Sequence, residues 1–482
     1  MGRAGPWRRL SRQRGACNDA RRRHHCSAAA KGEHSSSRPC RPRWGPVSNR
    51  GGGTMAGFWQ GTISRRACVF TALGGPLLAS CVRRTSEPAA GERKPAAQPV
   101  RLRWWSRGTP EWNDMLQEVT QAYMRAFPHV TLDYEFQPSE GYTDKILAAA
   151  ASDTMPDVFH LNSQHVISLA AKGVLLDLTP LLEGDKEIRR GDFFPWAWLR
   201  AEYQGKLYAM PLKGTCNVMW INRDLFDRNG LALPPATWTW EQYVTVARRL
   251  SNPPEVWGGW TYPWQVAVWQ NGGELIDRTG KRVLLDQAAA YEAIQWVADH
   301  ALTQRIAPLP SEAQDLRRGV PGTSGRVAIY PGGEPDFGAF LKVTDFQWTA
   351  LPMPPGKQQA SFGASTLFGM DPKGQRTAPA WAFLKWFTTG EEAQSILNKA
   401  GKMGVPPYRP VYEKLFLNQP PRSDVKKVLG DMAQQNRPYL EQVINAPEIE
   451  AIFSQELAPV WRGEATAREA TRRVAEKITP LL

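Results

Sequence analysis

The sequence is poor in cysteine and has no long apolar run. Six cysteines occur in 482 residues, and five of them precede residue 82, which leaves Cys216 alone in the remainder of the chain. A single cysteine cannot form an internal disulfide bond, so a hydrophobic core must hold the fold together. No apolar run reaches 18 residues, and this excludes a transmembrane helix of ordinary length.

Motifs of several enzyme classes are also missing. After residue 81 the chain has no His-Glu-x-x-His pair, no phosphate-binding Gly-x-x-x-x-Gly-Lys-Ser/Thr loop and no Gly-x-Ser-x-Gly elbow. We therefore expect neither a metal hydrolase, nor an ATPase, nor a serine hydrolase, and no cofactor or metal. A secreted carbohydrate-active enzyme stays open as an alternative, because it needs only two facing carboxylates. Candidates for such a pair are Asp157, Glu274, Glu334 and Asp336.

Acidic residues are scarce only in the first part of the chain. Residues 1–54 hold 13 Lys or Arg against Asp19 and Glu33, whereas the chain from Cys81 onward has a net charge of +1. The formal charge of +14 therefore does not indicate nucleic-acid binding by the remainder. Residues 1–54 have too few aliphatic side chains to form a core. We interpret them as wrongly translated sequence upstream of a start at Met55, with a disordered basic extension as the alternative.

The first informative segment that is present has the proportions of an export signal. Arg65 and Arg66 precede an apolar run of 13 residues that ends at Ala79, a length typical of a signal peptide and too short for a membrane span. Leu78-Ala79-Ser80-Cys81 resembles a bacterial lipobox, in which the cysteine is lipidated. We expect a signal peptide at residues 55–80 and an extracytoplasmic protein anchored to the cell membrane through Cys81. The arginine pair leaves open the general or the twin-arginine export route.

A linker is predicted at residues 81–98, because this segment has no apolar period. From Val100 to Gly173 the apolar spacing predicts strands and helices in alternation, with Thr109 and Pro110 at the start of the first helix. This pattern is typical of an α/β fold with a mostly parallel sheet, whose ligands bind beyond the carboxyl ends of the strands. Later helices are predicted at 240–250, 287–302, 378–388, 391–400 and 411–417, and strands at 218–222 and 326–330.

Several later segments resemble the family 1 extracellular solute-binding proteins of ABC importers. Their order and spacing are similar from about Arg101 to the C-terminus. The resemblance implies an α/β, two-lobe periplasmic-binding-protein-like fold, with mixed sheets flanked by helices and a ligand cleft between the lobes. It also implies non-covalent binding of a sugar, oligosaccharide or polyol, and delivery to a membrane permease. The segments are Gly141–Leu147, Met155–Phe159, Val218–Phe226, Asn271–Glu274, Gly325–Tyr330 and Trp381–Phe387.

The family resemblance further implies that the chain crosses three times between the lobes. By analogy the crossings fall near residues 211–214, 359–363 and 401–404. Lobe 1 then comprises residues 99–212 and 362–402, and lobe 2 comprises residues 213–361 and 403–482. We expect a monomer with no nucleic-acid partner. A sensor that feeds a membrane kinase would have the same fold and cleft, so it stays open as an alternative to the importer.

Aromatic side chains are the first candidates for sugar contact, because a sugar has an apolar face for stacking and hydroxyls at its edge. The chain has 20 tryptophans, although core packing explains most tryptophans in proteins. We expect Trp264→Ala to weaken binding at least tenfold, about 1.4 kcal/mol. The predicted contacts are Trp105, Ser106, Asn162, Trp220, Trp260, Tyr262, Trp264, Gly273, Glu274, Tyr330, Gly332, Ser365 and Arg409.

Three of the polar candidates have a structural alternative. Asn162 suits a helix N-cap as well as a ligand contact. The stretch from Gly272 to Glu274 suits a plain turn, and Arg409 suits a surface salt bridge. The sequence also departs from the family near Glu334, where many members carry a tryptophan and this chain has none. The shape of the site at that point therefore cannot be taken from the family.

Overall fold

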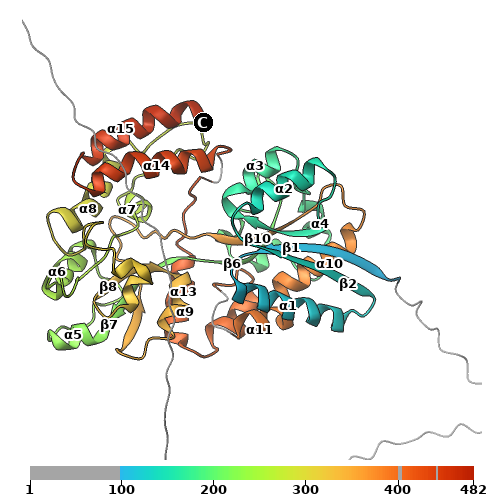
Figure 1. The fold of residues 1–482 in the computed structure, drawn as a ribbon, viewed down its shortest axis with the longest axis horizontal. Coiled ribbons are helices and arrows are strands. Elements are labelled where there is room, and N and C mark those ends of the chain that lie inside the picture. The colour runs from blue at the N-terminus through green and yellow to red at the C-terminus, as the bar shows by residue number, and fades with distance from the viewer. Residues whose placement is uncertain (1–97, 400–403, 441–442) are drawn as a thin grey trace, which may run out of the picture. The chain divides into compact units, whose positions relative to one another are not determined.

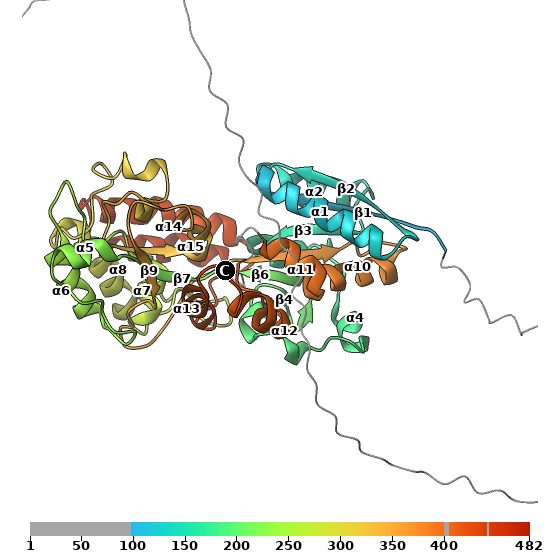
Figure 2. The ribbon, with the colours of Figure 1, turned by 90° about the horizontal axis from the view of Figure 1, so that it is seen from below.

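The computed structural model describes residues 98–399, 404–440 and 443–482. The signal segment, Cys81 and almost all of the linker lie outside the described residues. Two lobes, each built around a sheet, make up the described chain (Figures 1 and 2). One sheet has five strands in the order β2-β1-β3-β10-β6, and the other has three in the order β8-β7-β9. The predicted two-lobe α/β fold with mixed sheets is therefore confirmed.

The five-stranded sheet combines strands from two separate segments of the chain: β1, β2, β3 and β6 come from the first segment, and β10 comes from the second. Its strands β1 and β2, and likewise β1 and β3, pair in parallel, while β10 pairs antiparallel to β3 and to β6. A short ribbon of β4 (Glu202–Tyr203) and β5 (Lys206–Leu207) accompanies it. The strands are β1 (Val100–Arg107), β2 (Val130–Gln137), β3 (Val158–Asn162), β6 (Met210–Gly214) and β10 (Ser365–Met370). The helices are α1 (Pro110–Ala126), α2 (Tyr142–Ala151), α3 (Val166–Ala171), α4 (Thr179–Gly184), α10 (Thr377–Thr389) and α11 (Glu391–Asn398).

The three-stranded sheet has antiparallel partners on both sides of its central strand β7. Its strands are β7 (Asn217–Asn222), β8 (Ile329–Gly333) and β9 (Trp348–Leu351). The remaining helices are α5 (Arg223–Arg228), α6 (Trp240–Leu250), α7 (Trp264–Gln270), α8 (Ala288–Leu302), α9 (Phe337–Phe340), α12 (Arg409–Val411), α13 (Ser423–Ala433), α14 (Ala446–Trp461) and α15 (Ala467–Ile478).

Two predicted elements differ from those observed. The strand expected at 326–330 begins at Ile329, because Arg326 and Ala328 bond instead to the backbone of Trp257. The helix expected at 411–417 is a short α12 followed by a π-helical segment, Tyr412–Leu417. The other predicted strands and helices lie within a few residues of the observed ones, which is the usual uncertainty of element boundaries.

Local sequence explains the start of the first lobe, and ring packing holds it to distant helices. The Thr109 hydroxyl accepts a hydrogen bond from the Trp112 backbone at 3.4 Å, and Pro110 occupies the first helical position. On β1 the Trp104 ring is fully buried. Its centroid lies 5.2 and 5.6 Å from those of Phe383 and Phe387 on α10, in edge-on contact. Aromatic pairs of this geometry contribute beyond the area that they bury.

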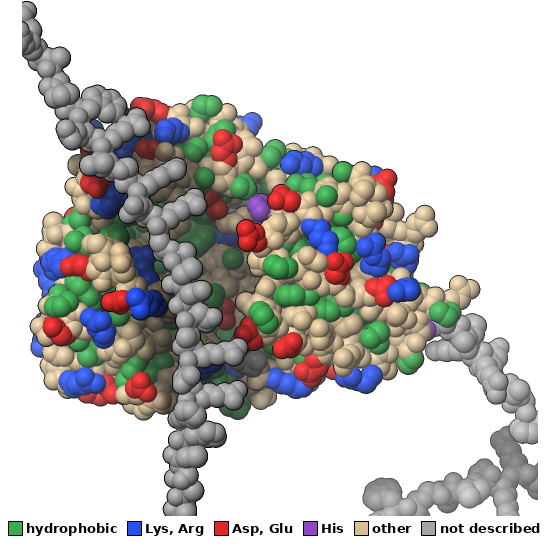
Figure 3. All heavy atoms as spheres, in the orientation of Figure 1, with side chains coloured by type: hydrophobic (Ala, Val, Ile, Leu, Met, Phe, Trp, Pro, Cys, Tyr) green, Lys and Arg blue, Asp and Glu red, His purple; other side chains and the backbone are tan. Residues whose placement is uncertain are grey.

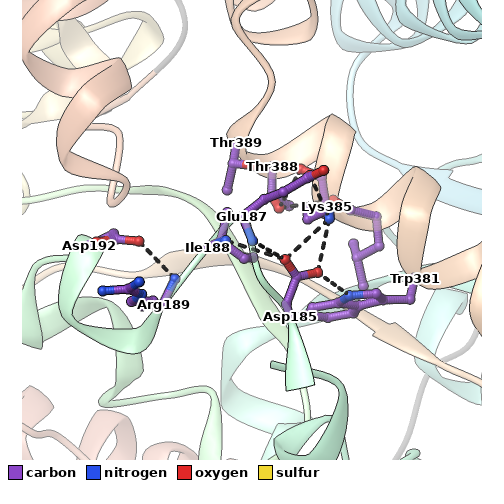
Figure 4. A network of polar contacts seen from close by, with 10 residues as sticks. Asp185, Glu187, Ile188, Arg189, Asp192, Trp381, Lys385, Thr388 and Thr389 are labelled. Carbon is purple, nitrogen blue, oxygen red and sulfur yellow. Dashed lines mark hydrogen bonds and ion pairs between the residues drawn. The ribbon is translucent and has the colours of Figure 1, made fainter. Parts of the chain in front are cut away.

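A buried carboxylate fastens the segment after α4 to α10. Figure 4 shows Asp185 receiving hydrogen bonds from the Trp381 ring nitrogen and the Lys385 ammonium, both at 2.9 Å. The backbone nitrogens of Glu187 and Ile188 donate to its other oxygen at 2.8 and 3.3 Å. Burial raises the pKa of Asp185, but these donors outweigh it and lower the pKa to about 2. The carboxylate is therefore ionised and well bonded at neutral pH.

Three chain segments lie side by side where the two lobes meet. The backbones of Gly214 and Val405 exchange hydrogen bonds of 2.9 and 2.8 Å. Thr215 donates its backbone N–H to Ala364 at 2.9 Å, and a Cβ on Gly363 would overlap the Thr215 carbonyl. These contacts lie in or next to the segments 211–214 and 359–363 where crossings are predicted, whereas residues 401–403 lie outside the described part. The lobe boundaries stay a prediction.

The described surface carries charges of both signs. On the face shown in Figure 3, Lys and Arg side chains alternate with Asp and Glu side chains rather than gathering in one area. None of the helices in the described ranges is both long enough and apolar enough to cross a membrane.

Candidate functional site

A cavity of about 610 Å³ lies beside the first crossing. Lys213 at the end of β6 and Thr215 just after it form one wall. Glu334, which directly follows β8, also lines the cavity. The other lining residues are Thr323, Pro335, Gly338 and Ala339, together with residues 342–345, which come after α9. The cavity therefore lies at strand ends of both sheets, the usual place for ligands in open α/β folds.

The electrostatics of this cavity centre on Glu334. Its side chain is only 5% exposed, and its backbone N–H donates to the Cys216 carbonyl at 2.8 Å. Burial raises the pKa of Glu334 to about 7, although the nearby charge of Lys213 opposes the shift. Burial likewise lowers the pKa of Lys213, and Glu334 opposes that shift. Perturbed groups of this kind cluster at functional sites.

The lining suits the binding of hydroxyl groups. Lys213 and Lys342 can donate hydrogen bonds, Glu334 and Asp345 can accept them, and the hydroxyl of Thr215 can do both. The Lys213 ammonium also lies 4.8 Å from the centre of the Trp112 ring, which fixes one side of the cavity. Among the described lining residues there is no aromatic ring, so the lining offers hydrogen-bonding and charged groups rather than a stacking surface.

A second cavity of about 500 Å³ is lined by Trp269, Val443 and residues from the segments 190–202, 274–280 and 437–440. Four of its charged side chains are paired: Arg437 bonds Glu274 at 2.8 Å, and Arg190 bonds Glu202. Paired charges of this kind are structural, so we take the first cavity as the candidate site. The predicted contact Glu274 belongs to this second cavity.

Two predicted aromatic contacts line a third cavity, of about 410 Å³, together with Trp461 on α14. Tyr262 is buried there, and its hydroxyl donates to Gln270 at 2.8 Å. Trp264 is half-buried, with its ring edge-on to Phe453 at 5.5 Å. The cavity is mostly apolar and does not share a lining residue with the first cavity.

The other aromatic candidates in the second lobe pack into its interior. Trp220 on β7 is 1% exposed, stacks on Phe340 at 4.5 Å and donates its ring N–H to the Gly333 carbonyl. Trp260 is buried in a small cluster, with Tyr330 packed against it. Packing in the interior of the lobe therefore accounts for these tryptophans without requiring a ligand.

The candidates in the first lobe are also largely enclosed. Trp105 is buried, with the Lys145 ammonium 4.1 Å from its ring centre. Ser106 is buried and lies 3.2 Å from the His160 ring nitrogen. Asn162 accepts a hydrogen bond from the Gln164 backbone at 3.2 Å, so the N-cap alternative describes its contact.

The remaining candidates have tight or peripheral positions. A Cβ on Gly332 would overlap the Tyr330 ring, and one on Gly273 would lie 3.0 Å from a backbone nitrogen. Ser365 pairs with Gly214 in the sheet. The Arg409 guanidinium lies 4.5 Å from the centre of the Phe194 ring, and no ion pair to it is seen among the described residues.

None of the thirteen predicted contacts lines the 610 Å³ cavity in the described chain. Glu334, which the sequence offered only as a candidate carboxylate, does line it. Sequence reasoning missed Lys213, Thr215, Lys342 and Asp345. A usable signal existed for the first two, because they lie in or next to the predicted first crossing, where both lobes approach.

Comparison with known proteins identifies relatives of low identity. The chain is 23% identical over 201 residues to a protein of Brucella abortus (strain 2308) assigned as a binding protein, and this match covers 39% of the chain and 47% of that protein. It is 26% identical over 289 residues to an uncharacterized lipoprotein of Streptomyces antibioticus, covering 56% of the chain and 62% of the relative. The chain thus spans about half the length of the first of these relatives.

Solved structures agree with the fold. An ABC substrate-binding protein of Listeria monocytogenes, in complex with cycloalternan, is similar with a TM-score of 0.68 at 22% identity. The match covers 80% of this chain and 99% of that one. In addition, the family model of the bacterial extracellular solute-binding proteins matches residues 109–394. This match covers more than half of the sequence and includes every strand of both sheets except β1, and the chain therefore belongs to the bacterial extracellular solute-binding protein family.

Proposed function

We propose that the protein binds a sugar, an oligosaccharide or a polyol without altering it, and delivers it to the membrane permease of an ABC importer. The observation that carries this proposal is the cavity between Lys213, Thr215 and Glu334, at strand ends of both sheets. Its donors and acceptors suit a polyhydroxylated solute. The Listeria relative, which was solved with a cyclic oligosaccharide, supports the ligand class.

The mechanism is a shift between conformations. A solute that touches residues of both lobes stabilises the arrangement in which those residues are close together. Such a solute changes the populations only through its different affinity for the two states. The closed form then presents the surface that the permease binds, and the protein acts as a monomer.

The protein is exported and held at the outer face of the cell membrane through lipidated Cys81. The lipobox-like sequence supports this location, as does the similarity to the Streptomyces lipoprotein. Residues 81–98 connect the anchor to the two lobes. They allow the binding domain to reach a permease in the same membrane.

Thermal unfolding with a panel of ligands tests the proposal. A soluble form that begins after Cys81 is melted with mono- and oligosaccharides, polyols and glycerol phosphodiesters. A solute that binds only the folded state stabilises it by about 2.7 kcal/mol at a hundredfold excess over its dissociation constant. We expect a selective rise in the midpoint, with the solute recovered unchanged. No rise with any solute, or conversion of one of them, contradicts the proposal.

A further inference from the structure

Glu334 occupies a position where several segments meet at the candidate site. It belongs to the short turn η6 (Glu334–Asp336) that follows β8. Its backbone is bonded to Cys216, at the end of the first crossing. Its carboxyl faces the backbone N–H of Gly404, the last residue of the predicted third crossing. Glu334 is therefore fixed in place by the chain at the junction of the lobes, and not by one lobe alone.

The groups that face this carboxyl are few. The Lys213 ammonium approaches it from β6, and the Asp336 carboxylate lies on its own turn. The thiol of Cys216 is fully buried beside it, and burial raises the pKa of that thiol. Asp336 itself accepts a hydrogen bond from the Gly333 backbone at 3.0 Å. One cation and one anion therefore act on the Glu334 carboxyl with opposite effects on its pKa, and burial makes the net shift of that pKa upward.

The result is a carboxyl group that exchanges its proton near neutral pH. Burial raises its pKa to about 7, so the protonated and ionised forms are both populated when the cavity is empty. Glu334 is nevertheless one of the residues that line the cavity. An extracytoplasmic protein meets the pH of the surroundings rather than that of the cytoplasm, so the balance between the two forms varies under working conditions.

We propose that Glu334 binds the solute directly, as an ionised carboxylate that accepts hydrogen bonds from solute hydroxyls, and that it releases a proton when the solute binds. This inference rests on the proposed function, because it concerns the same cavity. A hydroxyl donates its hydrogen to the carboxylate more strongly than to the neutral acid. The bound solute therefore favours the ionised form and lowers the pKa of Glu334.

The sign of the pH dependence follows from linkage. Above about pH 8 Glu334 is ionised before binding, and affinity does not change with pH. Below pH 7 the empty site must first lose a proton, so affinity falls by up to tenfold per pH unit until the pKa of the complex is reached. Solute is thus held at neutral and alkaline pH and released on acidification.

Calorimetric titration of the full-length protein tests this inference. The solute identified by thermal unfolding is titrated between pH 5.5 and 8.5, in two buffers of different ionisation enthalpy. We expect the wild type to lose at least tenfold in affinity at pH 5.5. It should release about a quarter of a proton per solute at pH 7.5, about half at pH 7 and close to one at pH 6, because a pKa of about 7 leaves the empty site protonated to these extents. Glu334→Gln is expected to bind more weakly with no pH dependence. Glu476→Gln, an exposed carboxylate on α15, is expected to keep the wild-type profile.

The outcomes separate this inference from the proposed function. A wild type that binds equally well across the range, without releasing a proton, overturns the role of Glu334 while leaving the solute-binding function intact. A Glu334→Gln variant whose affinity falls with pH as steeply as that of the wild type also overturns the role of Glu334. The proton count needs no variant, so it decides the question even if Glu334→Gln does not fold. No binding of any solute at any pH removes both proposals.

Discussion

Gln164 and Glu450 lie 286 positions apart in sequence and are joined by two hydrogen bonds. The Gln164 amide donates to the two carboxylate oxygens of Glu450 at 2.9 and 2.8 Å. Gln164 belongs to η1 (Ser163–His165), directly after β3, whereas Glu450 lies on α14. The contact therefore connects the segment at the carboxyl end of β3, in the first lobe, to a helix of the second lobe.

This contact is expected to favour the closed arrangement of the lobes. Gln164→Ala should shift the protein toward the open form and weaken solute binding about two- to fivefold, because an exposed bond of this kind contributes about 0.5–1 kcal/mol. Small-angle scattering of the solute-free protein should show a larger radius of gyration. Gln117→Ala, an exposed position on α1, serves as the control. Identical radii and affinities for both variants would show that the bond does not influence closure.

Variants of the first cavity test where the solute binds. Lys213→Met and Thr215→Val each remove a polar group from the lining, and each is expected to weaken binding at least tenfold, about 1.4 kcal/mol. Trp264→Ala in the same calorimetric series tests the prediction made from the sequence, also a tenfold loss. An unchanged affinity for Trp264→Ala removes that residue from the site. Unchanged affinity for both cavity variants moves the site away from Lys213 and Thr215.

The Asp185 network predicts a loss of stability on substitution. Asp185→Asn keeps the shape but removes the charge that Lys385 and Trp381 bond, and we expect a loss of about 1–3 kcal/mol at pH 7. Because the folded pKa of about 2 lies below the value near 3.9 of an unfolded aspartate, this stabilisation is present above pH 4 and is lost as the pH falls toward 2. Urea unfolding at pH 7 and pH 3 measures both effects.

A neighbouring carboxylate provides the matched control for that experiment. Glu187 contacts the same Lys385 ammonium at 2.7 Å, but its side chain is 76% exposed. Exposed ion pairs contribute little, so Glu187→Gln should change the free energy of unfolding by no more than about 0.5 kcal/mol. Equal losses for the two variants would mean that burial of Asp185 is not what makes its bonds strong.

His300 on α8 predicts acid sensitivity of the second lobe. It is fully buried, and neither ring nitrogen has a hydrogen-bond partner in the described chain. Burial lowers its pKa to about 3. The unfolded chain takes up a proton below about pH 6.5 whereas the folded protein does not, so stability is lost as the pH falls from 6.5 toward 3.

Replacing this histidine removes its share of the acid sensitivity. The phenylalanine of His300→Phe cannot be protonated. We expect it to pack against Trp296, whose ring centroid lies 4.3 Å from that of His300. Between pH 8 and pH 5 the wild type should lose about 2 kcal/mol more stability than this variant. Thermal and urea unfolding at both pH values measure the difference, and exposed His129→Gln is the control. Parallel losses in wild type and His300→Phe would contradict the assignment.

Much of the fold could be predicted because the evidence for it is local. Thr109 and Pro110 mark the start of α1. The Thr109 side chain accepts a hydrogen bond from a backbone N–H group of the first turn, and Pro110 has no N–H group that needs a partner. Both effects depend only on adjacent residues. Apolar alternation likewise marks β1 and β2. The strand β8 was misplaced by three residues because Arg326 and Ala328 bond to Trp257, a partner about 70 positions away that no local pattern reveals.

By itself the sequence determined the α/β class, the order of the elements and the family resemblance. Only the tertiary structure decided which side chains face a cavity. Burial of Trp220, and the exposure of Lys213 and Thr215 to the cavity, depend on contacts with residues more than a hundred positions away or on another strand. Residue type and spacing set what a segment can form, whereas packing between distant segments sets which of its atoms a solute can reach.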